Sequence, residues 1–185
     1  NLLHLTLPQS FQDFGSFLFT TAEDLLADPS GFVCVTQDEI QRIVTLPTSG
    51  TTGTAKRIYF TAADQELTID FFRAGMSTLA VPGDRVLILL PAQREGSVGN
   101  LLRLGLQRLG CTPFPHGPFD DEAAILRLIR ENDINILVGS PVQLHRLLRW
   151  DQAFSILEHG QIQRVLVSTD TLPETIRLNL QIHWN

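Results

Sequence analysis

The chain has 185 residues and a mass of 20.6 kDa, which is the size of one ordinary domain. Its 14 Lys and Arg residues against 20 Asp and Glu residues give a formal charge of −6, which argues against a protein that holds duplex nucleic acid through its overall field. A composition of 43% hydrophobic and 18% charged residues argues against a disordered chain. A small anionic ligand stays compatible with this charge, because backbone N–H groups can bind one locally.

Short apolar runs alternate with longer stretches of helical spacing along the chain. The runs predict strands at 31–35, 43–46, 86–90, 112–115, 134–138 and 165–168. Helices are predicted from Ala62 to a stop at 81–84, after Asp120, and over 98–109, 142–150 and 173–182. The first of these helices has an apolar stripe that we expect to face the core: Leu67, Phe71, Phe72, Met76 and Leu79. The alternation predicts an α/β fold with a mainly parallel sheet layered between helices.

The length of the apolar runs and the first residues of the chain bear on the cell compartment. The longest strongly apolar run, at 86–90, is too short to cross a bilayer, and the first residues lack the basic flank of a signal peptide. We therefore expect a cytoplasmic protein with no membrane partner.

The two cysteines, Cys34 and Cys111, lie in apolar runs without metal-ligand spacing, and we expect both to be buried and reduced. The chain begins without Met and stops inside a helical pattern, so we expect it to be truncated at both ends.

One segment, residues 46–57, differs from this background. It places five hydroxyl side chains, two glycines and a lysine within nine residues, between two predicted extended runs. Glycine allows close backbone approach to an anion, hydroxyl groups add neutral donors, and Lys56 adds a compact charge, so the natural ligand is a polyphosphate. A solvent-exposed loop of the same composition is the alternative. A Walker A loop is disfavoured, since Ala55 precedes the lysine and Arg57 follows it.

This segment resembles the phosphate-binding signature of the adenylate-forming, AMP-binding superfamily, whose pattern runs Thr-Ser-Gly-Thr/Ser-Thr-Gly-x-Pro-Lys. The sequence departs from the pattern at Ala55, where proline is usual, and at Arg57, where glycine is common. The stretch 19–25 is similar to one upstream of the loop in phenylacetate–CoA ligases, the closest branch, and weaker similarities cover 81–86, 106–115 and 136–141. The positions that match the signature are Thr48, Ser49, Gly50, Thr51, Thr52, Gly53 and Lys56.

The resemblance implies an ATP-dependent acid–CoA ligase with ATP, Mg²⁺ and coenzyme A as cofactors and a small carboxylic acid, aryl or acyl, as substrate. The acid would attack the α-phosphate of ATP to give an acyl-adenylate, and coenzyme A would then displace AMP. The seven matching residues would bind the pyrophosphate part of ATP, whereas catalytic residues and metal ligands cannot be assigned in this chain.

The resemblance also implies that residues 1–185 form one partial AMP-binding domain. The family's later motifs and its C-terminal lid domain are absent, so the fragment alone is expected to be inactive. Two alternatives stay open: a non-catalytic nucleotide-binding module, and an adenylation enzyme that passes the acyl group to a carrier-protein thiol. The oligomeric state is not predicted.

Overall fold

The chain divides into two compact units in a computed structural model that describes residues 10–16, 19–46 and 55–184. Unit 1 comprises Asn1–Thr61 and unit 2 comprises Ala62–Asn185. The boundary falls where the sequence predicts the start of the first long helix. The expectation that the chain is one partial domain of a larger protein stays a prediction.

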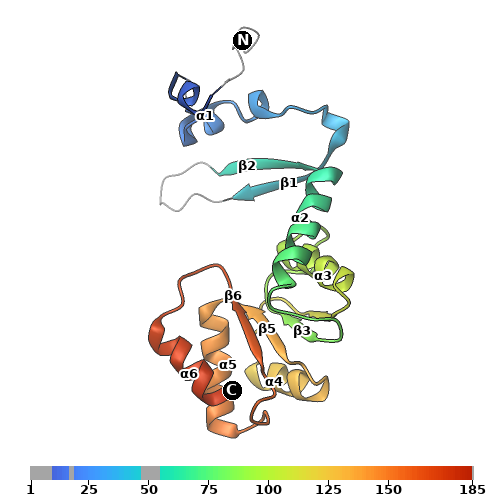
Figure 1. Cartoon of the computed structure of the whole chain (residues 1–185), viewed down its shortest axis with the longest axis vertical. Helices are drawn as coiled ribbons and strands as arrows, with labels where there is room; N and C mark the ends of the chain where they lie inside the picture. The colour runs from blue at the N-terminus through green and yellow to red at the C-terminus, as the bar shows by residue number, and fades with distance from the viewer. Residues whose placement is uncertain (1–9, 17–18, 47–54, 185) are drawn as a thin grey trace. The chain divides into compact units, whose positions relative to one another are not determined.

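Unit 1 consists of short helices followed by an antiparallel hairpin (Figure 1). Helix α1 begins after Thr21, whose hydroxyl accepts from the Asp24 N–H while the Asp24 carboxylate accepts from the Thr21 N–H, a complete capping box. The elements of unit 1 are the 3-10 helices η1 (Phe11–Ser16), η2 (Pro29–Phe32) and η3 (Gln37–Glu39), helix α1 (Ala22–Ala27), and strands β1 (Ile40–Leu46) and β2 (Lys56–Thr61).

The predicted strand at 31–35 is wrong. Asp28 accepts hydrogen bonds from the Gly31 N–H at 3.0 Å and the Ser30 hydroxyl at 2.8 Å, and Pro29 fixes φ at the first position of the turn. These local bonds close a 3-10 turn at the start of the apolar run. Cys34 is therefore exposed, against expectation, whereas Cys111 is buried as predicted.

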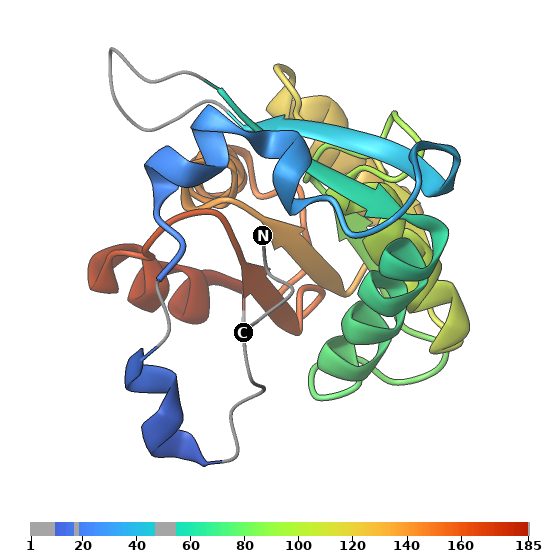
Figure 2. The ribbon, with the colours of Figure 1, turned by 90° about the horizontal axis from the view of Figure 1, so that it is seen from above.

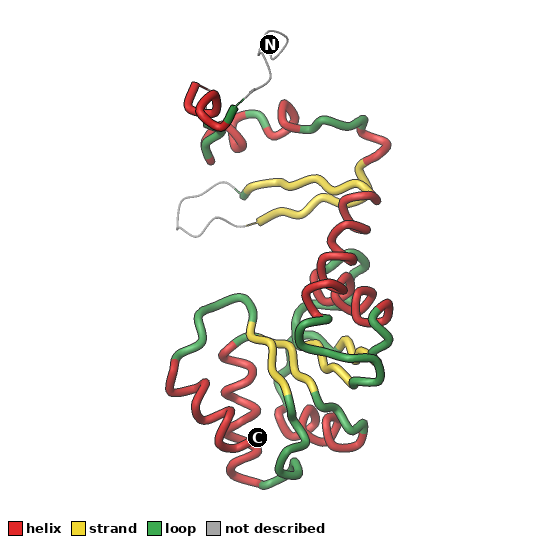
Figure 3. The backbone as a smooth tube through the Cα atoms, viewed as in Figure 1, coloured by secondary structure: helices red, strands yellow, loops and turns green. Residues whose placement is uncertain are grey.

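Unit 2 contains a four-stranded parallel sheet with helices on both faces, which confirms the predicted fold class (Figure 3). The order β4-β3-β5-β6 places the first strand of the unit in the middle of the sheet. The strands are β3 (Arg85–Ile88), β4 (Thr112–Pro115), β5 (Ile136–Gly139) and β6 (Arg164–Val167). The helices are α2 (Ala62–Met76), α3 (Val98–Arg108), α4 (Glu122–Glu131), α5 (Pro141–Phe154) and α6 (Glu174–Trp184).

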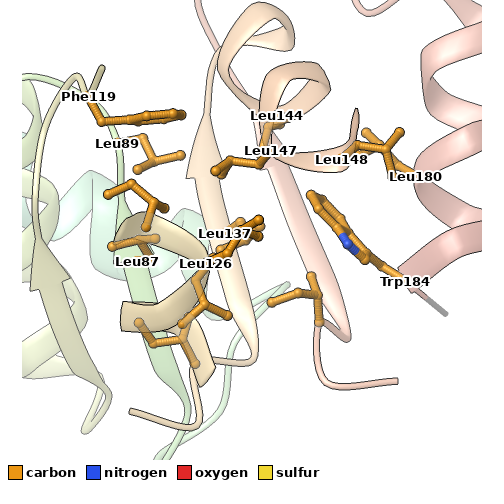
Figure 4. Packing of buried hydrophobic residues seen from close by; sticks show 14 residues of the cluster. Leu87, Leu89, Phe119, Leu126, Leu137, Leu144, Leu147, Leu148, Leu180 and Trp184 are labelled. Carbon is orange, nitrogen blue, oxygen red and sulfur yellow. The ribbon is translucent and has the colours of Figure 1, made fainter. Parts of the chain in front are cut away.

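The central strand β3 supplies two separate cores because successive side chains point to opposite faces of the sheet. Leu87, and Leu89 just after the strand, belong to a cluster with residues of α4, α5 and α6, and Figure 4 shows Leu126, Leu144 and Trp184 in the same cluster. Val86 and Ile88 belong to the other core, with residues of α2 and α3. Both faces of this strand are thus fully covered, and its sequence is a continuous apolar run for that reason.

The core-facing stripe of α2 differs from the prediction. Met76 is buried and Phe72 is half-buried, but Leu67 and Phe71 are 72% and 70% exposed. The buried residue of the middle turn is Ile69, three positions before Phe72. Helices α2 and α3 lie side by side (Figures 1 and 2), and the face toward α3 follows these residues rather than the most apolar ones.

A buried polar network joins the strands at the amino-terminal edge of the sheet. The Asp84 carboxylate accepts from the Val81 N–H at 2.7 Å, from the Asn135 amide at 2.8 Å and from the Arg164 guanidinium at 3.0 Å. Asn135 accepts in turn from the Arg85 N–H at 2.9 Å. Burial raises the pKa of Asp84, but the donors and the charge of Arg164 outweigh it, so the pKa lies below its ordinary value.

We expect Asp84→Asn to lower the free energy of unfolding by about 2 kcal/mol at pH 7, because a hydrogen-bonded ion pair is lost. A carboxyl whose pKa is lowered by folding stabilises the protein above its unfolded pKa, and this contribution disappears as the pH falls through the folded pKa. The difference between wild type and variant should therefore shrink below about pH 4. Urea unfolding of both proteins between pH 2.5 and 7 measures it, and a difference that does not change with pH would refute the ionic role of Asp84.

Candidate functional site

The predicted phosphate loop connects the two strands of the unit 1 hairpin. The pairing runs from Ile40 opposite Thr61 to Leu46 opposite Lys56, so the chain between that last pair, 47–55, forms the connection. The residues of the predicted site that lie outside the described part of the chain are Thr48, Ser49, Gly50, Thr51, Thr52 and Gly53. Their contacts with phosphate stay predictions, and Lys56 is the one predicted site residue that the structure places.

Lys56 is the first residue of β2, at the base of the loop, and it is half-buried. Alternation along the strand puts Lys56 on one face with Ile58 and Phe60, whereas the exposed Arg57 lies on the other face opposite Thr45. Two adjacent cations therefore point to opposite sides of the hairpin. Only Lys56 combines a position next to the loop with partial burial, which strengthens the interaction of a charge with an anion.

The carboxyl edge of the unit 2 sheet is a second place where a ligand crevice is expected. The chain leaves β3 toward β4 on one side and later reaches β5 on the other, with α3 and α4 on opposite faces. In open parallel sheets, ligands bind at the carboxyl ends of two neighbouring strands whose following connections run in opposite directions. The residues that follow the two central strands are Leu89–Pro91 and Ser140.

Gln143 holds these two strand ends together, and sequence reasoning missed it. Its amide oxygen accepts from the Ser140 N–H at 2.9 Å, and its amide nitrogen donates to the Leu89 carbonyl at 3.0 Å. Ser140 caps α5 in return through its hydroxyl, which accepts from the Gln143 N–H. A sequence pattern could have revealed the cap, since Ser-Pro-x-Gln after a predicted strand is typical of a capping box with proline at the first helical position.

His116 directly follows β4 at this edge. The imidazole Nδ1 lies 3.2 Å from the Gly117 carbonyl, and the His116 main-chain N–H donates to the Ile88 carbonyl. Gln93 donates to the His116 carbonyl at 2.9 Å. These contacts fix the turn after β4, and they agree with a structural histidine.

Two of the segments with weaker similarity, 81–86 and 106–115, contain turns that lead into strands of the sheet. Gly83 has φ of 95° in the turn before β3, and its N–H donates to the Gly110 carbonyl. Gly110 has φ of 85° just after α3, where the Cys111 N–H returns to the Leu106 carbonyl, as in a helix C-cap motif. Both positions need a residue that adopts positive φ without strain. In 81–86 and 106–115 these glycines therefore have a role in the fold.

Neither a cluster of metal-ligating side chains nor a membrane-spanning helix occurs in the part of the chain that the structure describes. Over residues 10–16, 19–46 and 55–184, no three His, Cys, Asp or Glu side chains come together as a metal site would require. Within the same part of the chain, no helix combines the length and the hydropathy needed to span a bilayer.

A comparison with protein families gives no match, and a comparison with curated protein sequences gives none either.

Several solved structures are similar to this chain in their fold. An open conformation of 2-hydroxyisobutyryl-CoA ligase, in complex with 2-HIB-AMP and CoA, aligns with 88% of this chain and 39% of its own length, at a TM-score of 0.68 and 17% identity. The inhibitor-bound N-terminal domain of FACL13 from Mycobacterium tuberculosis aligns with 76% of this chain and 33% of its own length, at a TM-score of 0.57 and 22% identity.

O-succinylbenzoate coenzyme A synthetase (MenE) from Bacillus subtilis, in complex with AMP, aligns with 75% of this chain and 27% of its own length, at a TM-score of 0.53 and 17% identity. The chain thus spans less than two fifths of the length of these proteins. At these identities the likeness concerns the fold. The chain shares its fold with the aligned part of these proteins.

Proposed function

We propose that the chain is the phosphate-binding part of an ATP-dependent acid–CoA ligase that forms an acyl-adenylate and then a CoA thioester. The observation that carries this proposal is the coincidence of two independent features. The signature at residues 48–56 is a sequence feature, and it falls at the turn of a hairpin in a chain whose fold matches CoA ligases.

The residues of the loop would act by positioning and by electrostatics. Lys56 would neutralise charge on the departing pyrophosphate, and the hydroxyl groups of Thr48, Ser49, Thr51 and Thr52 would donate to its oxygens. Gly50 and Gly53 would allow the backbone to approach. Mg²⁺, when bound, would supply further positive charge to neutralise the phosphates. Because the described residues contain no cluster of metal-ligating side chains, we assign the ion no ligand here.

The finer assignment that we propose is the phenylacetate–CoA ligase branch, with an aromatic or small carboxylic acid as substrate. Its support is the similarity at 19–25, where Thr21 and Asp24 have a local explanation as the capping box of α1. The structural matches include ligases for 2-hydroxyisobutyrate and for O-succinylbenzoate, so an aliphatic acid is the competing substrate class. We further propose that residues 1–185 belong to one larger AMP-binding domain of a cytoplasmic enzyme.

Acid-dependent exchange of pyrophosphate into ATP tests the proposal. The assay uses the protein produced from the reading frame that carries these residues, with a panel of aromatic and aliphatic acids. Exchange with one class supports the function and identifies the substrate, and thioester formation on addition of CoA separates a CoA ligase from an enzyme that serves a carrier protein. Binding of ATP without exchange across the panel would instead favour a non-catalytic nucleotide-binding module.

We expect Lys56→Ala to weaken binding of MgATP to the 185-residue chain by about 10- to 100-fold, because a charge-assisted contact with phosphate is lost. Arg57→Ala is the matched control, since it removes the same charge one residue away on the opposite face of β2. Isothermal titration with both variants measures the effect. Equal affinities of the two variants would contradict the role of Lys56, and circular dichroism verifies that both are folded.

A further inference from the structure

An open groove lies beside α5 in unit 2, and its lining includes none of the residues of the predicted phosphate loop. Its volume is about 340 Å³, and it is lined by Glu122, Arg146, Arg149, Trp150, Ala153 and Phe154. Five of these six residues belong to α5, and only Glu122 comes from the start of α4. We name these six residues the α5 groove.

Two aromatic rings form the apolar part of the α5 groove. Trp150 and Phe154 are four residues apart on the helix, so their side chains share one face. The ring centroids are 4.9 Å apart with an angle of 34° between the planes. Trp150 is 39% exposed and Phe154 is 61% exposed, whereas Leu147 and Leu148 of the same helix are buried. The pair is therefore not part of the core, and its ring surface is open to a planar ligand.

The two arginines of the groove have different surroundings. Arg146 is held by Glu122, with guanidinium-to-carboxylate distances of 2.6 Å, and it also stacks over Phe119 with 5.2 Å to the ring centroid. Its charge is thus largely neutralised. Arg149 differs, since none of the carboxylates in the described part of the chain lies within ion-pair distance of it. The chain as a whole carries −6, so a free arginine next to exposed rings is a local site of opposite charge.

From this juxtaposition we propose that the α5 groove binds a small planar aromatic anion, whose ring stacks on Trp150 and Phe154 and whose anionic group pairs with Arg149. Stacking on aromatic side chains accepts many ring systems, and a guanidinium binds carboxylate and phosphate alike. A nucleotide and an aromatic carboxylate share this chemistry. The charge of the groove disfavours a cation, and the net charge of the chain disfavours a second copy.

Trp150 provides the readout, because the chain has two tryptophans and the other, Trp184, is buried against Asp151. In ¹⁵N-labelled protein the two indole N–H signals are assigned with Trp150→Phe. The probes are AMP against adenosine, and indole-3-acetate against indole-3-acetamide. We expect the anionic member of at least one pair to shift the Trp150 signal saturably while the Trp184 signal stays unchanged. Which pair responds identifies the source of the ligand.

Variants separate this site from the phosphate loop. Arg149→Glu should weaken binding at least about tenfold, and Arg149→Gln should weaken it less, since it removes the charge without reversing it. Arg127→Glu is the matched control, an exposed arginine of α4 outside the groove, and it should bind as wild type does. Lys56→Ala should leave the Trp150 shift intact, so failure of the proposed ligase function would not affect this result. The proposal is overturned if no anionic probe shifts the Trp150 signal, or if Arg149→Glu binds as well as Arg127→Glu.

Discussion

Asp151→Ala is expected to lower the free energy of unfolding of the chain by about 3 kcal/mol or more. Asp151 is 2% exposed, and one carboxylate oxygen accepts from the N–H groups of Ile156 at 3.0 Å and Leu157 at 2.9 Å. The other oxygen accepts from the indole N–H of Trp184 at 2.9 Å and lies 3.1 Å from the His183 imidazole. Alanine would leave these donors without an acceptor, and each buried donor left unsatisfied costs about 1–3 kcal/mol.

Chemical denaturation monitored by tryptophan fluorescence measures this loss. Asp70→Ala is the matched control, because Asp70 forms only exposed ion pairs with Arg73 and Arg108, and such pairs contribute little. Asp151→Asn sharpens the test: an amide can still accept from the two loop N–H groups, but its NH₂ group would face the indole donor. It should therefore lie between wild type and Asp151→Ala. Equal stability of Asp151→Ala and Asp70→Ala would show that the network does not link α5 to α6.

Gly105→Ala and Gly75→Ala are expected to change stability in opposite directions, although both place the same methyl group on a helix. At Gly105, in α3, a Cβ atom would lie 2.9 Å from the Ile69 carbonyl oxygen and 3.0 Å from the Arg73 nitrogen of α2. Neither backbone atom can move aside without separating the two helices. Overpacking of this kind costs about 1–3 kcal/mol.

Gly75, in α2, has no neighbouring atom within 4 Å of the added Cβ. There the substitution should stabilise the chain by up to about 1 kcal/mol, because alanine is the better helix former. The melting temperatures of the two variants, measured by thermal unfolding beside wild type, test these opposite changes in stability. If Gly105→Ala raised the melting temperature as Gly75→Ala should, the close approach of α2 and α3 would not exist in solution.

Local patterns were sufficient to predict the parallel sheet of unit 2. The apolar runs at 86–90 and 134–138 become β3 and β5 because both of their faces are covered, which is the condition that such runs indicate. The run at 31–35 is also mainly apolar, but it follows Asp28 and Pro29, whose local hydrogen bonds and fixed φ favour a 3-10 turn. Hydrophobicity alone could not reveal which face of α2 is buried. That depends on the position of α3, where Gly105 lets the backbone of α2 approach at Ile69 while Phe71 stays exposed.

The candidate sites differ in how much of each could be predicted from local sequence patterns. The phosphate loop has a dense, ordered signature, and the structure adds the strand register that places Lys56 at its base. Gln143 had a local signal in its capping box, but its bond to the Leu89 carbonyl spans 54 positions and could not be anticipated. The α5 groove had no sequence signal, since Trp150 reads as an ordinary packing residue until its exposure is known.

The network around Asp84 has a consequence for the order in which the chain acquires its structure during synthesis. Asp84 pairs with Asn135 and Arg164, which are 51 and 80 positions further along. The hairpin of unit 1 can close as soon as it leaves the ribosome, because its partners are near neighbours in sequence. Strand β3, by contrast, emerges early with two apolar faces and an acidic residue whose counter-charge has not yet been translated. The Asp84 network can therefore close only after β6 has been synthesised, and we expect the apolar faces of β3 to stay open to aggregation until the strands and helices that cover them have emerged.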